Sequence, residues 1–272
     1  MERKFSLVYL TSAASSPPEM IYQAARAGFD FVSLRTIAMG LPNELNFGLA
    51  FNKTLLNDTK RAIQETGVKV LDIENARIHD AVNLKKYLPE MEVAAELGAK
   101  AVLSNVWSAD RAFNIETFAE LCEHAKTFGL RVNLEFVTWA KITNVSEALD
   151  LINMSGCENA GIVVDTLHFS RSRCSLEELA AVPPQRLTAL HLCDAPAELP
   201  DTVDGLIHTG RDERMYVGEG GIDIAGIVRN MPSAVVCGIE IPHIKRTKVI
   251  GSSEHVHRCI EQAKTYLASH QL

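Results

Sequence analysis

Four ionisable residues end or follow short apolar segments in the second half of the chain. They are Glu135 in NLEFV, Asp165 in VVDTLHF, His191 in LHLCD and Glu240 in GIEIP. Three carboxylates that converge on one small space repel one another, so at least one pKa rises unless a cation lies among them. The sequence therefore predicts that these four residues hold one divalent metal ion, provided that the fold brings them together.

The ligand types restrict the metal and leave room for a substrate. Carboxylate oxygens with one imidazole suit Mn²⁺, Zn²⁺, Co²⁺ or Mg²⁺. Four protein ligands leave two positions of an octahedral ion open. A substrate that chelates the ion through a carbonyl oxygen and a neighbouring hydroxyl would fill them.

Proton transfer next to a ketone is the chemistry that this arrangement predicts. A metal acts as a Lewis acid on the carbonyl and stabilises the developing enediolate. A base within hydrogen-bond reach must take the proton, and Glu135 and Glu240 are the candidates, one to remove it and one to return it. His168, three residues after Asp165, is a further ionisable residue close to the same strand end.

Each of these residues also has a structural interpretation. A glutamate at a strand end often forms a surface ion pair, and His191 between two leucines fits a hydrogen-bonded core histidine. His168 can serve a helix start instead of a substrate. The occurrence of ionisable residues on four consecutive strand ends favours the metal hypothesis. Glu74, after VLDI, is a second candidate for the same edge.

Eight short apolar segments carry these residues and alternate with amphipathic runs. The predicted strands are Phe5–Leu10, Phe29–Leu34, Val68–Ile73, Ala101–Ser104, Arg131–Phe136, Gly161–Val164, Leu187–Leu192 and Val235–Ile239. Their near-continuous apolar character is typical of parallel strands buried on both faces. Helical spacing marks residues 113–128, 144–154 and 256–267. Ser16 with Glu19, and Asn144 with Glu147, have the spacing of a capping box at a helix start.

Eight strands, each followed by a helix, predict a single (β/α)8 barrel domain over residues 1–272. In such a barrel the carboxyl ends of the strands form the mouth where active sites lie, so the four ligands would meet there. A doubly wound open sheet is the alternative. It usually has a glycine-rich phosphate loop after its first strand, whereas residues 11–16 contain no glycine.

Composition argues against several classes of function. The net charge of −7 opposes binding to nucleic acids and to anionic membranes. No apolar run reaches the ~18 residues that would span a bilayer. Phe5–Leu10 is too short for the apolar core of a secretory signal, so a cytoplasmic location is expected. The six cysteines form no C-x-x-C motif and are predicted to be reduced core thiols.

Over nearly its whole length the chain resembles the xylose isomerase-like barrel family of sugar isomerases, epimerases and some dehydratases. The motifs that carry the resemblance are NLEFV, VVDTLHF, LHLCDA, GEGGID (218–223) and GIEIP. Within the family the chain resembles inosose (2-keto-myo-inositol) isomerases, which implies a small keto sugar or cyclitol as substrate and a place in inositol catabolism. The resemblance implies the same four metal ligands, His168 as the substrate histidine and Arg214 as the substrate arginine. Arg211 is the alternative arginine, because the segment between His191 and GEGGID is longer than usual.

Further residues of the predicted site have less specific signals. Arg35, at the end of the second strand, is expected to bind substrate hydroxyls or to balance charge. Trp107 and Phe136 are expected to flank the substrate ring, although core packing explains either of them equally well. Arg171, Arg173 and residues 195–217 are candidates for contacts in a homo-oligomer.

Three other functions remain open at this stage. A lyase of the 3-dehydroshikimate dehydratase type would use the same metal site to expel a hydroxyl group. A nuclease is disfavoured by the net charge of −7 and by the absence of further histidines at strand ends, since His79 and His208 have no assigned place. A non-catalytic binding protein on a barrel scaffold is the third, because a fold does not determine a function.

Overall fold

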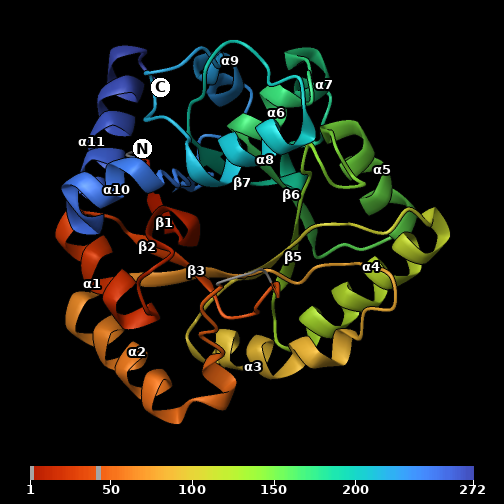
Figure 1. The fold of residues 1–272 in the computed structure, drawn as a ribbon. Helices are drawn as coiled ribbons and strands as arrows, with labels where there is room; N and C mark the ends of the chain where they lie inside the picture. Colours follow the sequence, from red (N-terminus) through yellow and green to blue (C-terminus); the bar gives the residue numbers. More distant parts are fainter. Residues whose placement is uncertain (1–2, 41–43) are drawn as a thin grey trace.

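A closed barrel of eight parallel strands forms the centre of the molecule. The computed structural model describes residues 3–40 and 44–272. Each strand pairs with the next along the chain, and the last pairs with the first (Figure 1). The strands are β1 (Phe5–Val8), β2 (Phe31–Arg35), β3 (Lys69–Glu74), β4 (Ala101–Ser104), β5 (Arg131–Glu135), β6 (Ala160–Asp165), β7 (Leu187–Leu192) and β8 (Cys237–Ile239). The (β/α)8 prediction is confirmed.

Helices surround the strands as a ring, which Figure 1 shows from α1 in red to α11 in blue. They are α1 (Pro17–Ala27), α2 (Lys53–Thr66), α3 (Leu88–Glu96), α4 (Arg111–Thr127), α5 (Val145–Ser155), α6 (Thr166–Arg171), α7 (Leu176–Ala180), α8 (Val203–Asp212), α9 (Ile224–Arg229), α10 (Ile244–Ile250) and α11 (Ser252–Ser269). Short 3₁₀ turns lie at Tyr9–Ser12, Leu49–Phe51, Leu84–Tyr87 and Pro184–Arg186.

The predicted helix starts are confirmed by their hydrogen bonds. At α1 the Ser16 amide donates to the Glu19 carboxylate at 2.8 Å. At α5 the Glu147 amide donates to the Asn144 side-chain oxygen at 2.9 Å. In both contacts a side-chain oxygen accepts from a backbone amide at the start of the helix, where amides have no intrahelical partner.

Several strand ends differ from the prediction by a few residues. β1 ends at Val8, because the next four residues turn into a 3₁₀ helix. β8 begins at Cys237, since the Val235 amide donates to the Pro232 carbonyl and is unavailable to the sheet. At the other end β6 continues through Asp165 and β3 through Glu74, so both carboxylates lie within strands.

The helix α8 lies in a segment for which the sequence predicted only a long loop. The Thr202 side chain caps it by accepting a hydrogen bond from the Gly205 amide at 3.0 Å. Gly205 and Gly210 lie within this helix, and glycine is an unfavourable helix residue, which weakened the sequence signal. The helix positions Arg211 in its last turn and leads directly to Arg214.

A large apolar core fills the space between the barrel and its helices, and a small apolar cluster of Leu103, Val163 and Ala189 lies apart from it. Val163 and Ala189 lie two residues before Asp165 and His191 on their strands. Since alternate residues of a strand share a face, these small apolar side chains line the barrel interior directly beneath the two polar residues.

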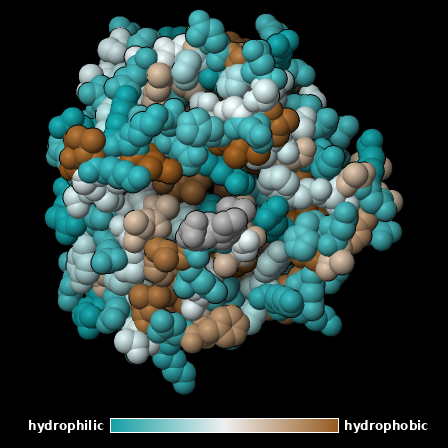
Figure 2. All heavy atoms as spheres, in the orientation of Figure 1, coloured by the Kyte–Doolittle hydropathy of each residue, from teal (hydrophilic) through white to brown (hydrophobic). Residues whose placement is uncertain are grey.

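The surface in Figure 2 is mostly hydrophilic, with hydrophobic residues in small scattered groups. None of the described helices is long and apolar enough to cross a membrane. All six cysteines are free thiols, as predicted. Arg171, expected as a surface residue for self-association, is 5% exposed and donates to the Pro196 carbonyl at 2.6 Å, so that expectation is wrong; Arg173 is exposed.

Candidate metal site at the mouth of the barrel

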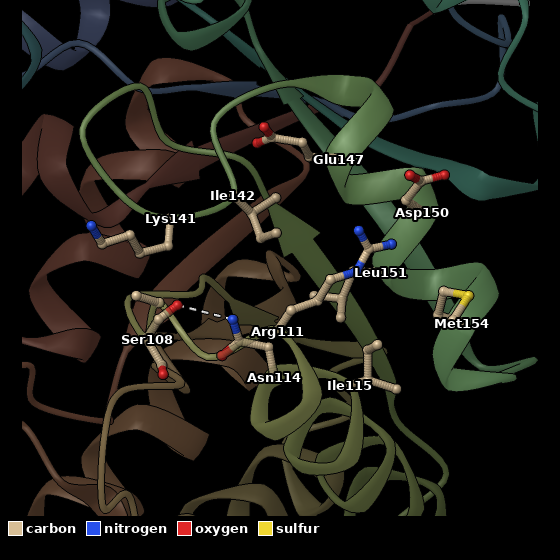
Figure 3. A pocket seen from close by; sticks show the side chains of 11 residues that line it. Ser108, Arg111, Asn114, Ile115, Lys141, Ile142, Glu147, Asp150, Leu151 and Met154 are labelled. Atoms are coloured by element: carbon tan, nitrogen blue, oxygen red, sulfur yellow. Dashed lines mark hydrogen bonds between the residues drawn. The ribbon is translucent and has the colours of Figure 1, made fainter.

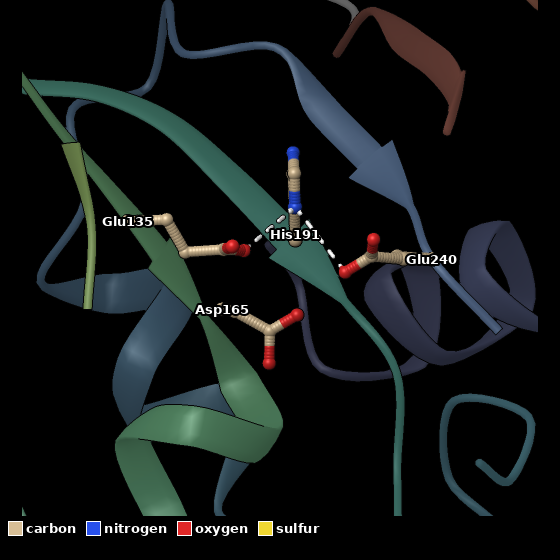
Figure 4. Close-up of side chains that lie close together, drawn as sticks. All are labelled: Glu135, Asp165, His191 and Glu240. Carbon is tan, nitrogen blue, oxygen red and sulfur yellow. Dashed lines mark ion pairs between the residues drawn. The ribbon is translucent and has the colours of Figure 1, made fainter. Parts of the chain in front are cut away.

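The four predicted ligands meet at the carboxyl ends of four neighbouring strands (Figure 4). One potential ligand atom from each of Glu135, Asp165, His191 and Glu240 lies within 4.8 Å of every other, and all four residues are buried. Glu135 and Asp165 end β5 and β6, His191 lies in β7, and Glu240 follows β8. Among the described residues, no other group of histidine, cysteine, aspartate and glutamate has this arrangement.

The pairing of the strands explains why these side chains converge. Asp165 is paired with His191 across β6 and β7, and His191 is paired with Gly238 across β7 and β8. A Cβ atom on Gly238 would lie 2.7 Å from Cδ2 of His191. Glycine is therefore required at this position if the imidazole is to lie against β8 and face the carboxylates.

The electrostatics of the site are set by carboxylates that crowd around one imidazole. Nδ1 of His191 lies 3.5 Å from Glu135 Oε1 and 3.4 Å from Glu240 Oε2, as the dashed lines of Figure 4 show. Burial opposes a charge on His191, but the two carboxylates outweigh it and raise its pKa. Burial, together with the charges of Glu240 and Asp165, raises the pKa of Glu135 to about 7.

Arg214 supplies the permanent positive charge of the site. Its Nη1 lies 2.6 Å from Asp165 Oδ2 and 3.0 Å from Glu240 Oε2, and its Nε donates to the Gly210 carbonyl at 2.7 Å. Burial would raise the pKa of Glu240, but Arg214 and His191 outweigh it and lower that pKa. Arg214 lines the pocket as predicted, yet protein groups occupy its Nη1 and Nε.

Two buried atoms of the cluster show that the site suits a metal ion. His191 Nδ1 and Glu240 Oε2 are shielded from solvent and make no hydrogen bond, although both belong to ion pairs within the cluster. Such atoms are unfavourable in a folded protein, since burial removes their contacts with water. A divalent cation bound by three carboxylates and one imidazole would satisfy both atoms, and this ligand set suits Zn²⁺, Mn²⁺, Co²⁺ or Mg²⁺.

His168 lies beside the cluster at the start of α6. Its amide donates to Asp165 Oδ1 at 3.0 Å, while its Nδ1 lies 3.4 Å from the donating amide of Thr138. Burial lowers the pKa of His168 to about 4, so the imidazole is neutral at neutral pH. The His168 side chain lines the pocket, and the Trp139 ring packs edge-on against it with ring centroids 4.8 Å apart.

The opposite wall of the pocket contains a buried ion pair. Arg35 and Glu74 both line the pocket, and Arg35 Nη2 lies 2.7 Å from Glu74 Oε2. Glu74, the second candidate for this edge of the barrel, therefore lies at the mouth as expected. Trp107 lines the pocket as expected. Phe136 is completely buried in the core and does not line it, so the expectation that Phe136 flanks a substrate ring is wrong.

Three polar or aromatic pocket residues were missed by sequence reasoning. Asn75 and Asn105 line the pocket and directly follow β3 and β4, so a polar residue after a strand was a usable signal. Trp139 lines it from the segment after β5. Its position four residues after Glu135 carried no comparable signal.

Asp194 organises the loop that contains GEGGID. Its carboxylate accepts hydrogen bonds from the amides of Ala195 at 2.9 Å, Gly218 at 3.0 Å, Gly220 at 2.9 Å and Ile222 at 3.1 Å. A Cβ atom on Gly220 would lie 2.2 Å from the Ala195 carbonyl oxygen, so this approach requires glycine. The motif therefore has a structural role here.

A second hollow lies outside the barrel mouth, between α4 and α5 (Figure 3). Asn114 crosses its floor and donates to the Ser108 carbonyl at 2.9 Å. Its charged side chains, including Arg111 and Lys141, are not part of the metal-type cluster. The chemistry-bearing residues are thus concentrated in the central pocket.

Known proteins resemble this chain in sequence. A 3-dehydroshikimate dehydratase of Pseudomonas aeruginosa is 26% identical over 247 residues, which are 84% of this chain and 35% of that protein. The chain thus spans about a third of the length of that relative. An inosose isomerase of Bacillus licheniformis is 27% identical over 210 residues, which are 72% of each chain.

Solved structures share the fold. The IolI protein with a bound zinc atom has a TM-score of 0.81 at 17% identity and covers 98% of this chain and 99% of its own. D-allulose 3-epimerase from Methylomonas sp. in complex with D-allulose has a TM-score of 0.68 at 18% identity, with 98% of each chain covered. The model of the xylose isomerase-like TIM barrel family matches residues 21–261, and the chain belongs to that family.

Proposed function

We propose that this protein is a metal-dependent isomerase or epimerase that moves a proton next to the ketone of a small polyhydroxylated substrate. The observation that carries the proposal is the convergence of Glu135, Asp165, His191 and Glu240 on one another. Two of them, Glu135 and Glu240, line the same pocket as His168. Relatives named inosose isomerase and L-ribulose 3-epimerase support it. 2-Keto-myo-inositol is accordingly the first substrate to test.

One divalent ion would be held by the four clustered residues, and when bound it would supply Lewis acidity toward the ketone oxygen. Zinc is the first metal to test, because the similar IolI structure contains it, with Mn²⁺, Co²⁺ and Mg²⁺ as alternatives. The chain itself contributes Arg214, which holds the carboxylates of Asp165 and Glu240 in place.

Proton movement is assigned to the two glutamates. Glu135 and Glu240 approach the site from opposite sides of His191 (Figure 4), so a substrate between them would present one face to each carboxylate. One glutamate would remove the proton and the other would return it. Neutral His168 would donate or accept a hydrogen bond at a substrate oxygen through Nε2, and Trp107 would flank the substrate ring.

A lyase is the second candidate, and a specific observation favours it. The match to 3-dehydroshikimate dehydratase extends over 84% of this chain. The same residues would remove the proton next to the ketone. A hydroxyl group would then leave with the electron pair of its C–O bond and take up the abstracted proton, so that water is released. The conjugated product would absorb in the ultraviolet, whereas an isomerised ketose would not.

The test uses metal-stripped protein reloaded with one metal at a time. We expect a metal-dependent reaction on 2-keto-myo-inositol, L-ribulose or 3-dehydroshikimate, detected by product analysis and by exchange of the α proton in deuterated water. Glu240→Gln and Glu135→Gln are each expected to lower kcat by about 100-fold or more. Glu261→Gln, an exposed change on α11, is the matched control and is expected to retain activity.

Two results would contradict parts of this proposal. Near wild-type turnover by Glu240→Gln would remove that residue from the acid–base role. If no ketone reacts or exchanges its α proton with any of the four metals, the assignment as an isomerase, epimerase or lyase is wrong.

A further inference from the structure

Two arginines at the central pocket lack the partners that partly buried arginines normally have. The Arg211 side chain forms no ion pair or hydrogen bond with any residue that the structure describes. Arg77 makes one hydrogen bond, from Nη1 to the Met39 carbonyl at 3.3 Å, and its Nε is buried without a partner. Both residues are partly buried, where an unpaired charge is unfavourable.

Both side chains border the pocket that contains the candidate metal site. Arg211 lines it directly. The Arg77 guanidinium lies 4.5 Å from the centre of the Trp107 ring, and Trp107 and Met39 are both pocket residues. The two arginines therefore present positive charge to a ligand that reaches the metal site.

Nearby carboxylates are already engaged by other groups. Glu74 pairs with Arg35 at 2.7 Å, and Glu44 lies 3.9 Å from the same arginine. Asp212 lies 3.0 Å from Nδ1 of His208. Burial and the charge of Arg211 lower the pKa of Arg77, and burial and the charge of Arg35 lower that of Arg211, as expected for positive groups in one neighbourhood.

We propose that Arg211 and Arg77 form a subsite for an anionic group of the substrate, a carboxylate or a phosphate, so that this enzyme acts on an anionic ketone. An anion between them would provide the charge-assisted hydrogen bonds that their guanidinium groups lack. The carboxylates of the metal site would remain with the metal and Arg214. That the bound anion is a substrate rests on the proposed function.

Binding can be measured without turnover, because both tryptophans of the chain, Trp107 and Trp139, line the pocket and report on it by fluorescence. The probes for metal-loaded protein are quinate, which is a cyclitol carboxylate, myo-inositol, which is its neutral counterpart, and myo-inositol 1-phosphate. Isothermal titration calorimetry gives the Kd independently. We expect at least one anion to bind about 10-fold or more tightly than myo-inositol, and more weakly as salt is added.

Variants assign the effect to the two arginines. Arg211→Gln and Arg77→Gln are each expected to weaken binding of the anion about 10- to 100-fold and to leave myo-inositol unchanged. Arg111→Gln makes the same charge change at an exposed residue of α4 and is expected to change neither affinity. Tighter binding of quinate identifies a carboxylate, and tighter binding of the phosphate ester identifies a phosphorylated substrate.

The failure of this proposal is distinguishable from the failure of the proposed function. Equal affinity for anionic and neutral probes, no binding of either anion at millimolar concentration, or an equal loss for all probes in Arg211→Gln would overturn the subsite. If the wild-type protein then turns over a neutral ketone, the proposed function stands without the subsite. If the anion binds as expected but no ketone loses its α proton, the subsite stands and the catalytic assignment fails.

Discussion

Buried carboxyl groups inside the barrel differ in how their charge is balanced. Asp165 receives hydrogen bonds on both oxygens, from His168 and Arg214. Asp72 is 1% exposed, and its Oδ2 has no hydrogen-bond partner. Burial raises the pKa of Asp72 to about 7, because Ser33 and the charge of His191 offset the loss of hydration only in part.

Replacement of Asp72 by asparagine is expected to remove a pH dependence of stability. The folded-state pKa lies above the unfolded value, so between about pH 4 and pH 7 only the folded protein keeps this proton. Stability from this group is therefore present at low pH and lost as the pH rises toward 7, by up to about 4 kcal/mol. We compare the free energy of unfolding of Asp72→Asn with that of wild type at two pH values. The difference is expected to favour the variant more at pH 8 than at pH 4.5.

The measurement is urea unfolding of metal-free protein at both pH values. Asp201→Asn, an exposed change, serves as the control and is expected to follow the wild type. If Asp72→Asn and wild type differ by the same free energy of unfolding at both pH values, Asp72 does not titrate in this range.

At the scale of elements, the loops after β7 and β8 position the site as much as the strands do. Asp194 and Met215 exchange backbone hydrogen bonds of 3.0 and 2.8 Å, which hold the residue next to Arg214. The Arg214 amide donates to the Pro242 carbonyl at 3.0 Å, close to Glu240. The loop contacts thus connect the counter-ion to the strand end that it neutralises.

We expect Asp194→Ala to destabilise the protein by about 3 kcal/mol, since four backbone amides lose a charged acceptor and the Gly218–Asp223 loop loses its anchor. Chemical denaturation measures the loss, and faster amide exchange at Gly220 and Ile222 would place it in the loop. Asp201→Ala is expected to stay within about 0.5 kcal/mol of wild type. Unchanged exchange at both amides would contradict the anchoring role.

At the scale of the whole molecule, the candidate site joins the ends of β5 to β8, which form half of the barrel. A cation that binds only the folded protein stabilises it by about 2.7 kcal/mol at 100 times Kd. We therefore expect chelation to lower the Tm by several degrees and Mn²⁺ to restore it. Mn²⁺ is preferable to Zn²⁺ in this measurement, because the six thiols of the unfolded chain would compete for zinc.

His191→Gln combined with Asp165→Asn is expected to abolish the Mn²⁺-dependent change in Tm, and Glu261→Gln is expected to retain it. Differential scanning calorimetry with and without Mn²⁺ provides the measurement. The same Tm for chelated and Mn²⁺-loaded wild type would contradict a metal site formed by these four residues.

The barrel and the four clustered residues could be predicted from the sequence, because both produce strong local signals. Strands buried on both faces are nearly continuous apolar segments, so Glu135 and Asp165 stand out where such segments end. In a closed parallel barrel all carboxyl ends meet at one mouth, so the order of elements alone predicts that these residues converge. Residue type then indicates the metal chemistry.

The rest was decided by tertiary structure, because it depends on distances between segments far apart in the chain. Nothing in the local sequence distinguishes Arg214, which is bound to Asp165, from Arg211, which has no partner among the described residues. The placement of Arg77 over Trp107 likewise arises only when the loops after β3 and β4 pack together. The type of a residue determines which interactions it is able to make. Packing determines which partners it meets and how much water it loses on folding, and these two together determine how its charge is balanced.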